Sequence, residues 1–272
     1  MRFSVVDFLN ARPLTWGLLR EPPPGVEVSR DLPSACADKL ARGEADVGLI
    51  PSIEYQRIPG LRVIPGLGIA ASSEVRSVLL VSKVSREKIR TVALDPASRT
   101  SAALTRILLE RRYGVRAAYA EGAGEDADAR LVIGDPALKT RLTGAVVLDL
   151  AAEWRAFTGR SFIFAFWAVR DGADAGAAER IVHASRDASR ERFATLVAEE
   201  ARESGLSEAV VEDYLRHSLH FDLDRGDFGG LELFYRLAAE LSLIPTARPL
   251  EFVSHGLGPL TGPAPSKAER PS

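Results

Sequence analysis

The chain has only one cysteine, Cys36, among 272 residues. A single thiol excludes an internal disulfide framework and a zinc site built from several cysteines. No apolar run approaches the roughly 20 residues that a membrane-spanning helix needs. The first residues are interrupted by Asp7, Asn10 and Arg12, so they lack the apolar core of a secretory signal. We therefore expect a soluble, cytoplasmic protein.

Neither sign of charge dominates the composition. The 35 Lys and Arg residues against 37 Asp and Glu residues give a formal net charge of −2. This balance argues against nucleic-acid binding through bulk charge. Hydrophobic residues make up 46% of the chain, which is enough for a core, and the length suits one large domain or two small ones.

The motifs of common cofactor and metal sites are missing. The sequence has no Gly-x-Gly-x-x-Gly, His-Glu-x-x-His or Gly-x-Ser-x-Gly. His217 and His220 precede acidic residues, but their order matches none of the zinc signatures. We therefore expect neither an organic cofactor nor a metal ion.

Strands and helices alternate along the first 170 residues. Short apolar runs predict strands at residues 3–6, 26–28, 47–50, 77–81, 91–94, 130–133, 146–148 and 162–169, and helical spacing predicts helices at 13–19, 32–41 and 102–112. The alternation predicts an α/β fold of two small units, with mixed or largely parallel sheets flanked by helices. After Asp171 the pattern is helical, with one long helix predicted at 179–203 and two more beyond it.

The sequence offers no long linker between the two units, so the strands near 77–83 and 162–170 are predicted crossovers. On this prediction, residues 1–82 and 170–260 form lobe one and residues 83–169 form lobe two. The C-terminal helices then complete lobe one, and the proline-rich tail 261–272 is expected to be disordered. Ligands of such folds sit beyond the carboxyl ends of strands and between lobes.

Polar residues follow or begin three of the predicted strands. Asn10 leaves the first strand, where its amide can reach a ligand or simply cap a helix. Ser52 lies in the turn after the strand 47–50, and Ser77 begins the first crossover strand. An ordinary turn or strand serine is the alternative for both, and Ser77 has no evident histidine partner that would make it a nucleophile.

Four polar residues, Ser98, Arg99, Thr100 and Ser101, open the predicted helix 102–112. Hydroxyls, a guanidinium and free N–H groups at a helix N-terminus suit an oxyanion. Simple capping of the helix is the alternative. The segment lacks the glycine pattern of a nucleotide-binding loop.

Several short segments occur in a characteristic order. They are Phe8-Leu9-Asn10 with Pro13-Leu14, Pro51-Ser52-Ile53-Glu54-Tyr55, Ser77-Val78-Leu79-Leu80, Ser98-Arg99-Thr100-Ser101, Ile133-Gly134-Asp135-Pro136-Ala137-Leu138, Asp149-Leu150-Ala151-Ala152-Glu153-Trp154 and Phe162-Ile163-Phe164-Ala165-Phe166-Trp167-Ala168. The ordered set, across roughly residues 3 to 245, resembles the chorismate dehydratase family of the futalosine route to menaquinone. That family usually has tyrosine where this chain has Phe8.

The resemblance implies a type 2 periplasmic-binding-protein-like fold used as a cytoplasmic enzyme. It implies a carbon–oxygen lyase that removes water from chorismate to give 3-[(1-carboxyvinyl)oxy]benzoate, without cofactor, metal, nucleic acid or membrane. Carried over by motif, Asn10 and Ser77 are the catalytic residues nearest the reacting ring. The residues implied to bind the carboxylate groups of the substrate are Ser52, Ser98, Arg99, Thr100 and Ser101. The oligomeric state is left open, and a homodimer is possible.

Two other functions remain open on the sequence. One is a non-catalytic binding protein for a small carboxylic acid, although the missing signal peptide argues against a receptor for transported solutes. The other is the related naphthoate synthase of the same pathway. That relative usually begins with a Ser-Pro-Cys-Pro-Asn-Asp type of segment, whereas this chain has Asp7-Phe8-Leu9-Asn10.

Overall fold

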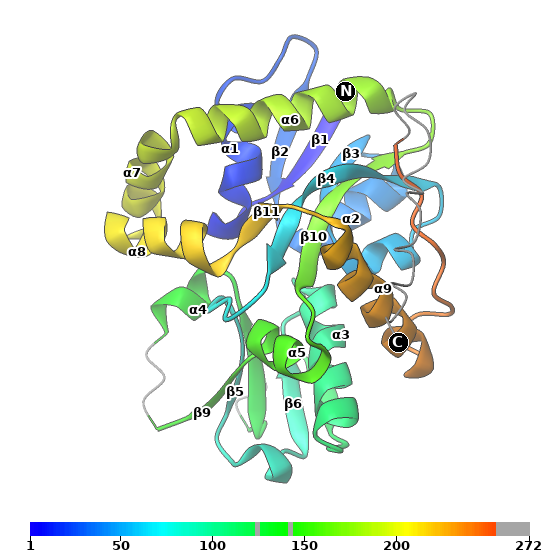
Figure 1. Ribbon diagram of the computed structural model, residues 1–272, viewed down its shortest axis with the longest axis vertical. Helices are drawn as coiled ribbons and strands as arrows, with labels where there is room; N and C mark the ends of the chain where they lie inside the picture. Colours follow the sequence, from blue (N-terminus) through cyan, green and yellow to red (C-terminus); the bar gives the residue numbers. More distant parts are fainter. Residues whose placement is uncertain (123–125, 141–143, 254–272) are drawn as a thin grey trace, which may run out of the picture.

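A computed structural model of the chain describes residues 1–122, 126–140 and 144–253. The described residues form two β-sheets, each with its own helices, and one sheet lies above the other in Figure 1. We call the larger sheet with its helices lobe one and the smaller sheet with its helices lobe two. The predicted disordered tail at 261–272 lies outside the described residues.

The sheet of lobe one has the strand order β11-β4-β10-β3-β1-β2. Its strands are β1 (Arg2–Val6), β2 (Glu27–Asp31), β3 (Val47–Pro51), β4 (Leu61–Ala71), β10 (Phe162–Arg170) and β11 (His220–Asp222). Strand β1 is parallel to β2 and β3, whereas β10 is antiparallel to β3 and β4. The central strands β3 and β10 are buried along almost their whole length, so both faces of the sheet are covered.

The sheet of lobe two has the order β7-β6-β8-β5-β9. Its strands are β5 (Val78–Ser82), β6 (Thr91–Leu94), β7 (Ala118–Glu121), β8 (Ala129–Ile133) and β9 (Val146–Asp149). Strand β6 is parallel to β7 and β8, and β5 is antiparallel to β8 and β9. Both sheets are therefore mixed, because the strands next to the crossovers run against their neighbours.

Helices flank both sheets, as Figure 1 shows. Lobe one carries α1 (Arg12–Arg20), α2 (Pro33–Arg42), α6 (Ala175–Glu191), α7 (Phe193–Ser204), α8 (Glu208–Asp213) and α9 (Arg225–Glu240), with the short turns η1 (Leu9–Ala11), η2 (Ser52–Gln56) and η5 (Tyr214–Ser218). Lobe two carries η3 (Arg86–Lys88), α3 (Arg99–Ile107), η4 (Leu108–Arg112), α4 (Asp135–Lys139) and α5 (Leu150–Thr158). Within the described residues, no helix is long and apolar enough to cross a bilayer.

The contact between α1 and α6 is close because Gly17 has no side chain. A Cβ atom at Gly17 would lie 2.7 Å from the carbonyl oxygen of Ser185. The Ser185 hydroxyl also accepts the backbone N–H of Leu18 at 2.9 Å. This packing anchors the C-terminal helices to the helix that follows β1, so the C-terminal segment completes lobe one.

The predicted α/β fold is confirmed, with differences in detail. Strand β4 was not predicted, because Pro65, Gly66 and Gly68 interrupt its apolar pattern. Gly66 has a positive φ of 76°, and the pairing of β4 with β10 shifts register at two places. The proline and glycine residues are therefore accommodated as irregularities within a continuous strand. The short strands β7 and β11 were also not predicted.

The prediction of a single helix at 179–203 is wrong. The segment is two helices, and they separate at Arg192, whose backbone has φ −112° and ψ 32°. The stretch contains neither proline nor glycine to mark the break. The separation follows from packing, since α6 lies along α1 while α7 turns toward α8.

Sheet membership also differs from the predicted division at residues 82 and 170. Strand β5 pairs with β8 and β9 of lobe two, and β10 pairs with β3 and β4 of lobe one. The chain therefore passes between the sheets at residues 72–77 and returns at 159–161. The apolar pattern of a buried strand is the same in either sheet, so it could not predict the partner.

Candidate functional site

A small cavity lies between the lobes, beyond the carboxyl ends of β1, β3 and β8. Its volume is about 40 Å³. The residues that line it are Val6, Phe8, Asn10, Pro33, Pro51, Ile69, Val78, Ser98, Ser101, Ile133, Gly134, Phe164 and Ala165. Three of the predicted site residues are thus brought together from distant parts of the chain, at the place where α/β folds bind ligands.

Asn10 reaches this cavity from the turn η1, directly after β1. The chain turns through η1 between Phe8 and Arg12. Pro13 then lies in the first turn of α1, where its missing N–H breaks no helical hydrogen bond. The Oδ1 atom of Asn10 is buried and has no hydrogen-bond partner among the described residues. A buried polar atom without a partner is unusual, and a ligand that donates a hydrogen bond would supply one.

Ser98 and Ser101 lie at the N-terminus of α3. Ser98 donates to the hydroxyl of Ser101 at 2.7 Å, and its side chain makes no capping bond to the backbone. The N–H groups of the first helical turn therefore have no side-chain cap from Ser98. Together with the helix dipole, this end of α3 is suited to a negatively charged group.

Ser52 and Thr100 join the two lobes beside the cavity. The Thr100 hydroxyl accepts the backbone N–H of Ile53 at 3.2 Å, and its oxygen lies 3.5 Å from Ser52 Oγ. Ser52 Oγ donates to the carbonyl of Ile163 on β10 at 2.8 Å. Both hydroxyls are buried and already engaged within the protein, and neither residue is among those that line the cavity.

The Arg99 side chain is directed at lobe one. Its guanidinium forms two hydrogen bonds to the carboxylate of Asp38 on α2, at 2.8 and 3.0 Å, and one to Glu54 at 3.0 Å. Arg99 therefore bridges the lobes and does not line the cavity. We call Arg99, Asp38 and Glu54 the arginine latch.

Ser77 is fully buried next to the cavity. Its hydroxyl accepts a hydrogen bond from the Tyr214 hydroxyl at 2.6 Å, and its carbonyl accepts the N–H of Gly134 at 2.8 Å. Val78 and Gly134 line the cavity, whereas Ser77 itself does not. Tyr214 lies 137 residues away in the sequence, so no local pattern could have indicated it.

Gly134 and the ring of Phe8 form one wall of the cavity. Gly134 has φ 64° and ψ −149°, a conformation that is essentially restricted to glycine. A Cβ atom there would lie 3.0 to 3.1 Å from three atoms of the Phe8 ring. The motif Ile133-Gly134-Asp135-Pro136-Ala137-Leu138 includes this glycine, but the sequence gives no sign of its contact with Phe8, which needs both lobes.

Carboxylates surround the turn η1 without lining the cavity. Asp135 of lobe two accepts the backbone N–H of Leu9 at 3.0 Å, and burial raises the pKa of Asp135. The buried Arg12 guanidinium pairs with Asp7 at 2.6 Å and with Glu200 at 2.9 Å. The residues lining the cavity in the described part of the chain carry no charged side chain.

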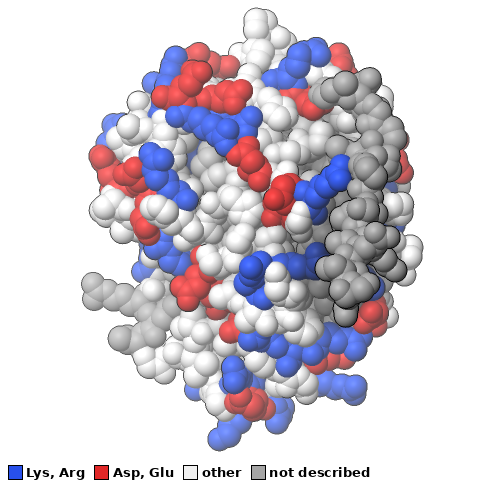
Figure 2. Space-filling view, in the orientation of Figure 1, with Lys and Arg blue, Asp and Glu red and all other residues white. Residues whose placement is uncertain are grey.

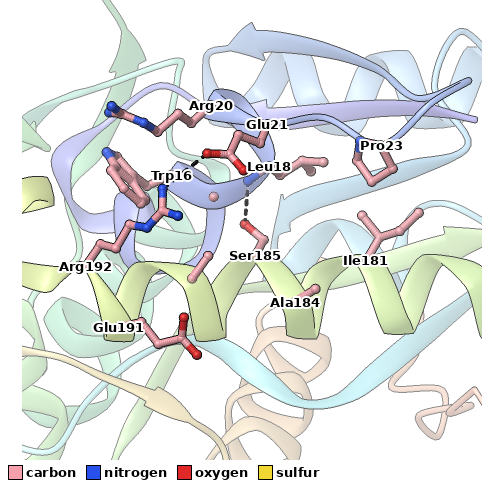
Figure 3. Close-up of a pocket in the computed structure, with 12 residues that line it drawn as sticks. Trp16, Leu18, Arg20, Glu21, Pro23, Ile181, Ala184, Ser185, Glu191 and Arg192 are labelled. Atoms are coloured by element: carbon pink, nitrogen blue, oxygen red, sulfur yellow. Dashed lines mark hydrogen bonds and ion pairs between the residues drawn. The ribbon is translucent and has the colours of Figure 1, made fainter.

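Larger hollows lie elsewhere on the surface. Figure 3 shows one of about 220 Å³ between the end of α1 and α6, where Trp16, Leu18 and Ile181 contribute apolar surface. None of the predicted site residues lines it, and it follows from the packing of two helices. Acidic and basic side chains are interspersed over the face in Figure 2. We therefore place the candidate site at the smaller cavity between the lobes, where the predicted residues meet.

The described residues contain no group of three or more His, Cys, Asp and Glu side chains arranged to hold a metal ion. The two histidines weighed as ligands have other partners. His217 contacts Asp213 at 3.0 Å, and His220 contacts Asp227 at 2.9 Å.

Solved structures share this two-lobed arrangement. A protein from Archaeoglobus fulgidus has a TM-score of 0.74 and 16% identity, covering 89% of this chain and 98% of its own. The periplasmic aliphatic sulphonate binding protein of Escherichia coli has a TM-score of 0.61 and 16% identity, covering 99% and 97%. The fold is therefore periplasmic-binding-protein-like, as the resemblance implied.

Comparison of sequences identifies the family, whereas the solved structures share only the fold. A family model described as menaquinone biosynthesis matches residues 1–240. A chorismate dehydratase of Thermus thermophilus is 31% identical over 252 residues, which is 84% of this chain and 91% of that protein. A chorismate dehydratase of Campylobacter jejuni is 32% identical over 171 residues, 61% of this chain and 66% of that protein. This chain therefore belongs to the chorismate dehydratase family of menaquinone biosynthesis.

Proposed function

We propose that this protein is a chorismate dehydratase that removes water from chorismate to give 3-[(1-carboxyvinyl)oxy]benzoate, and thus a carbon–oxygen lyase. Two named relatives and the matching family model support the reaction. The structural observation that carries the proposal is the cavity where Asn10, Ser98 and Ser101 converge from both lobes.

The reaction makes the substrate ring aromatic. A proton leaves the ring carbon that carries the enolpyruvyl ether, and its bonding electrons form a new ring double bond. The neighbouring C–O bond breaks, and the oxygen departs with that electron pair and gains a proton to form water. Because aromatisation drives the elimination, the protein has mainly to orient the substrate and assist the leaving hydroxyl.

Neutral side chains suit this task. In the proposal, Asn10 and Ser77 position the enolpyruvyl group and the leaving hydroxyl, and neither acts as the base. An amide and a hydroxyl are weak bases at neutral pH. The carboxylate of the substrate's own enolpyruvyl side chain then removes the ring proton. The uncharged lining of the cavity supports this assignment.

The carboxylate groups of the substrate are assigned to the N-terminus of α3 and to the turn at Ser52. Ser98 and Ser101 lie against the cavity and offer hydroxyls beside the first-turn N–H groups. Ser52 and Thr100 would contribute after a change of hydrogen-bond partners, since Ser52 donates to the Ile163 carbonyl within lobe one and Thr100 accepts the Ile53 N–H across the lobes. Arg99 would have to leave Asp38 and Glu54 before it could bind the substrate.

The lobes must separate to admit chorismate. A cavity of about 40 Å³ holds no more than a few water molecules, whereas sites for organic ligands have volumes of roughly 300–1,000 Å³. Hydrogen bonds between Leu9 and Asp135 and within the arginine latch close the lobes in this structure. Opening therefore requires that these contacts break.

Incubation of the purified protein with chorismate tests the function. We expect loss of chorismate and appearance of an aromatic product lighter by one water, measured by liquid chromatography with mass detection. Binding without turnover would instead indicate a carboxylic-acid binding protein. Turnover of the substrate of the naphthoate synthase, with chorismate untouched, would assign the chain to that enzyme.

The arginine latch leads to a prediction that separates two roles of Arg99. If Arg99 mainly holds the empty lobes closed, Arg99→Ala and Asp38→Ala should both lower KM for chorismate about 2- to 5-fold, because the latch must break before the substrate enters and partly exposed ion pairs contribute about 0.2–1 kcal/mol each. The kcat value should stay within about 2-fold of the parent value, since neither change touches the cavity. Steady-state kinetics of the two variants, measured side by side, gives both constants.

The matched pair makes the result decisive. A rise in KM far larger for Arg99→Ala than for Asp38→Ala would show that the guanidinium binds a substrate carboxylate directly. Equal, modest falls in KM would assign Arg99 to lobe closure.

The family resemblance also leads us to propose a cytoplasmic location for the enzyme. A homodimer stays an open prediction, which sedimentation equilibrium of the purified chain would test.

A further inference from the structure

Tyr214 connects the C-terminal helices to the serine predicted to act on the substrate. It begins the π-helical turn η5 of lobe one, and its hydroxyl donates to Ser77 Oγ at 2.6 Å. The Tyr214 side chain is 1% exposed and Ser77 is 0% exposed. A short, dry hydrogen bond of this kind restricts the orientation of both groups.

The backbone before Ser77 is held from two sides. Arg76 has a positive φ of 61°, a conformation that is costly for a residue with a side chain. The N–H groups of Val75 and Arg76 donate to the carboxylate of Asp149 at 3.2 and 2.7 Å. Arg76 Nε donates to Ser218 Oγ at 2.8 Å, so the same turn that supplies Tyr214 also fixes this arginine.

This restrained serine lies one residue from the cavity wall. Its covalent neighbour Val78 lines the cavity, and so does Gly134, whose N–H donates to the Ser77 carbonyl at 2.8 Å. Ser77 therefore lies directly behind two residues that form the cavity wall.

The direction of the hydrogen bond matters for the chemistry. A hydroxyl has one hydrogen and two lone pairs. Because Tyr214 donates, it occupies a lone pair of Ser77 Oγ and leaves the serine hydrogen for another acceptor. Among the described residues, no group accepts that hydrogen.

We propose that Tyr214 is a positioning residue, which turns the hydroxyl hydrogen of Ser77 toward the leaving hydroxyl of the substrate. The inference rests on the proposed dehydration. Ser77 donates only a hydrogen bond, and its O–H bond does not break. The leaving oxygen takes its bonding pair and gains the proton that the enolpyruvyl carboxylate removed from the ring, so atoms and charge balance.

Burial keeps Tyr214 in the donating form. Desolvation raises the pKa of its hydroxyl above the ordinary value, and the hydrogen bond to Ser77 opposes this only in part. Tyr214 therefore stays protonated throughout the pH range in which the protein would be assayed.

Tyr214→Phe removes the donor and keeps the ring. We expect kcat for chorismate to fall about 10-fold, as the loss of one hydrogen bond implies, while KM stays within about 2-fold. Combined with Ser77→Ala, Tyr214→Phe should cause no further loss, because the acceptor is already gone. Restoring a donor of similar size with 4-aminophenylalanine at 214 should recover most of kcat.

Tyr55→Phe is the matched control. Tyr55 is also fully buried, and its hydroxyl donates to the Pro249 carbonyl at 3.1 Å and accepts the Glu251 N–H at 2.8 Å. The control variant loses a comparable pair of hydrogen bonds away from Ser77, so its kcat should stay near the parent value. Thermal unfolding of each variant establishes that it is folded before its kinetics are compared.

The outcomes are distinct. A folded Tyr214→Phe variant with the parent kcat overturns the inference and leaves the proposed function intact. Equal losses from Tyr214→Phe in the parent and in the Ser77→Ala background also overturn it, since Tyr214 would then act independently of the serine. If the parent protein itself does not convert chorismate, the proposed function fails and the role of Tyr214 fails with it.

Discussion

Replacing Asn10 with alanine is expected to lower kcat for chorismate about 100- to 1,000-fold, which is the usual effect of removing one well-placed polar group from a reacting centre. The same change should leave the free energy of unfolding unchanged or slightly increased. The reason is that Asn10 Oδ1 is buried without a partner in the described structure, so alanine removes an unsatisfied acceptor and breaks no hydrogen bond. Steady-state kinetics and urea unfolding of one protein preparation measure both effects.

Asn10→Asp is the control for shape. It keeps the size of the side chain but places a negative charge at a cavity meant for a dianion, so we expect KM to rise as well as kcat to fall. Full activity in Asn10→Ala would remove Asn10 from the site. Full turnover in the Asn10→Ala, Ser77→Ala double variant would reject both assignments and the neutral-group mechanism with them.

Gly134→Ala is expected to be the most damaging single change to the cavity wall. The backbone conformation of Gly134 strains any other residue by about 1–3 kcal/mol. The new Cβ would press on the Phe8 ring at 3.0 Å, and such overpacking costs about 1–3 kcal/mol more. We expect the free energy of unfolding to fall by about 2–6 kcal/mol and chorismate turnover to fall by more than 10-fold, because Phe8 must move.

Gly114→Ala controls for a positive φ that lacks the contact. Gly114 also lies in lobe two and has a φ of 65°, close to the 64° of Gly134, but a Cβ atom there meets nothing within 4 Å. The control variant should lose only the strain energy of about 1–2 kcal/mol and keep its kcat. Equal effects of the two substitutions on turnover would show that the contact between Phe8 and Gly134 does not shape the site.

Local sequence patterns predicted those parts of the fold that follow from local physics. The strands β1, β3, β6 and β8 are short apolar runs that end at Asp, Pro or Gly, and the structure has each of them. Helix α2 begins at Pro33 and ends at Arg42, and the next residue, Gly43, has a positive φ of 75°, as proline at the start and glycine after the end of a helix indicate. Strand β4 was not predicted because Pro65, Gly66 and Gly68 break its apolar pattern. Its extended conformation depends on pairing with β10 on one side and β11 on the other.

For the candidate site, the sequence indicated some of the residues but not their partners. Asn10, Ser98 and Ser101 follow strand ends, where ligands of such folds bind, and the family resemblance assigned them to one substrate. The partners of Ser77 and Arg99 were not predictable. Ser77 meets Tyr214 137 residues away, and Arg99 meets Asp38 61 residues away. Such pairs depend on how two lobes and a helical segment dock.

The sequence by itself determined the two α/β units, the polar residues at their strand ends and, through its ordered motifs, the family. These follow from the spacing of apolar side chains and from the chemistry of neighbouring residues, and both are local properties of the sequence. Tertiary structure alone decided which sheet each crossover strand joins, which way Arg99 faces and which group donates to Ser77. Those outcomes depend on the burial of surfaces from separate lobes against one another, because buried polar groups take whichever partner that packing brings within reach.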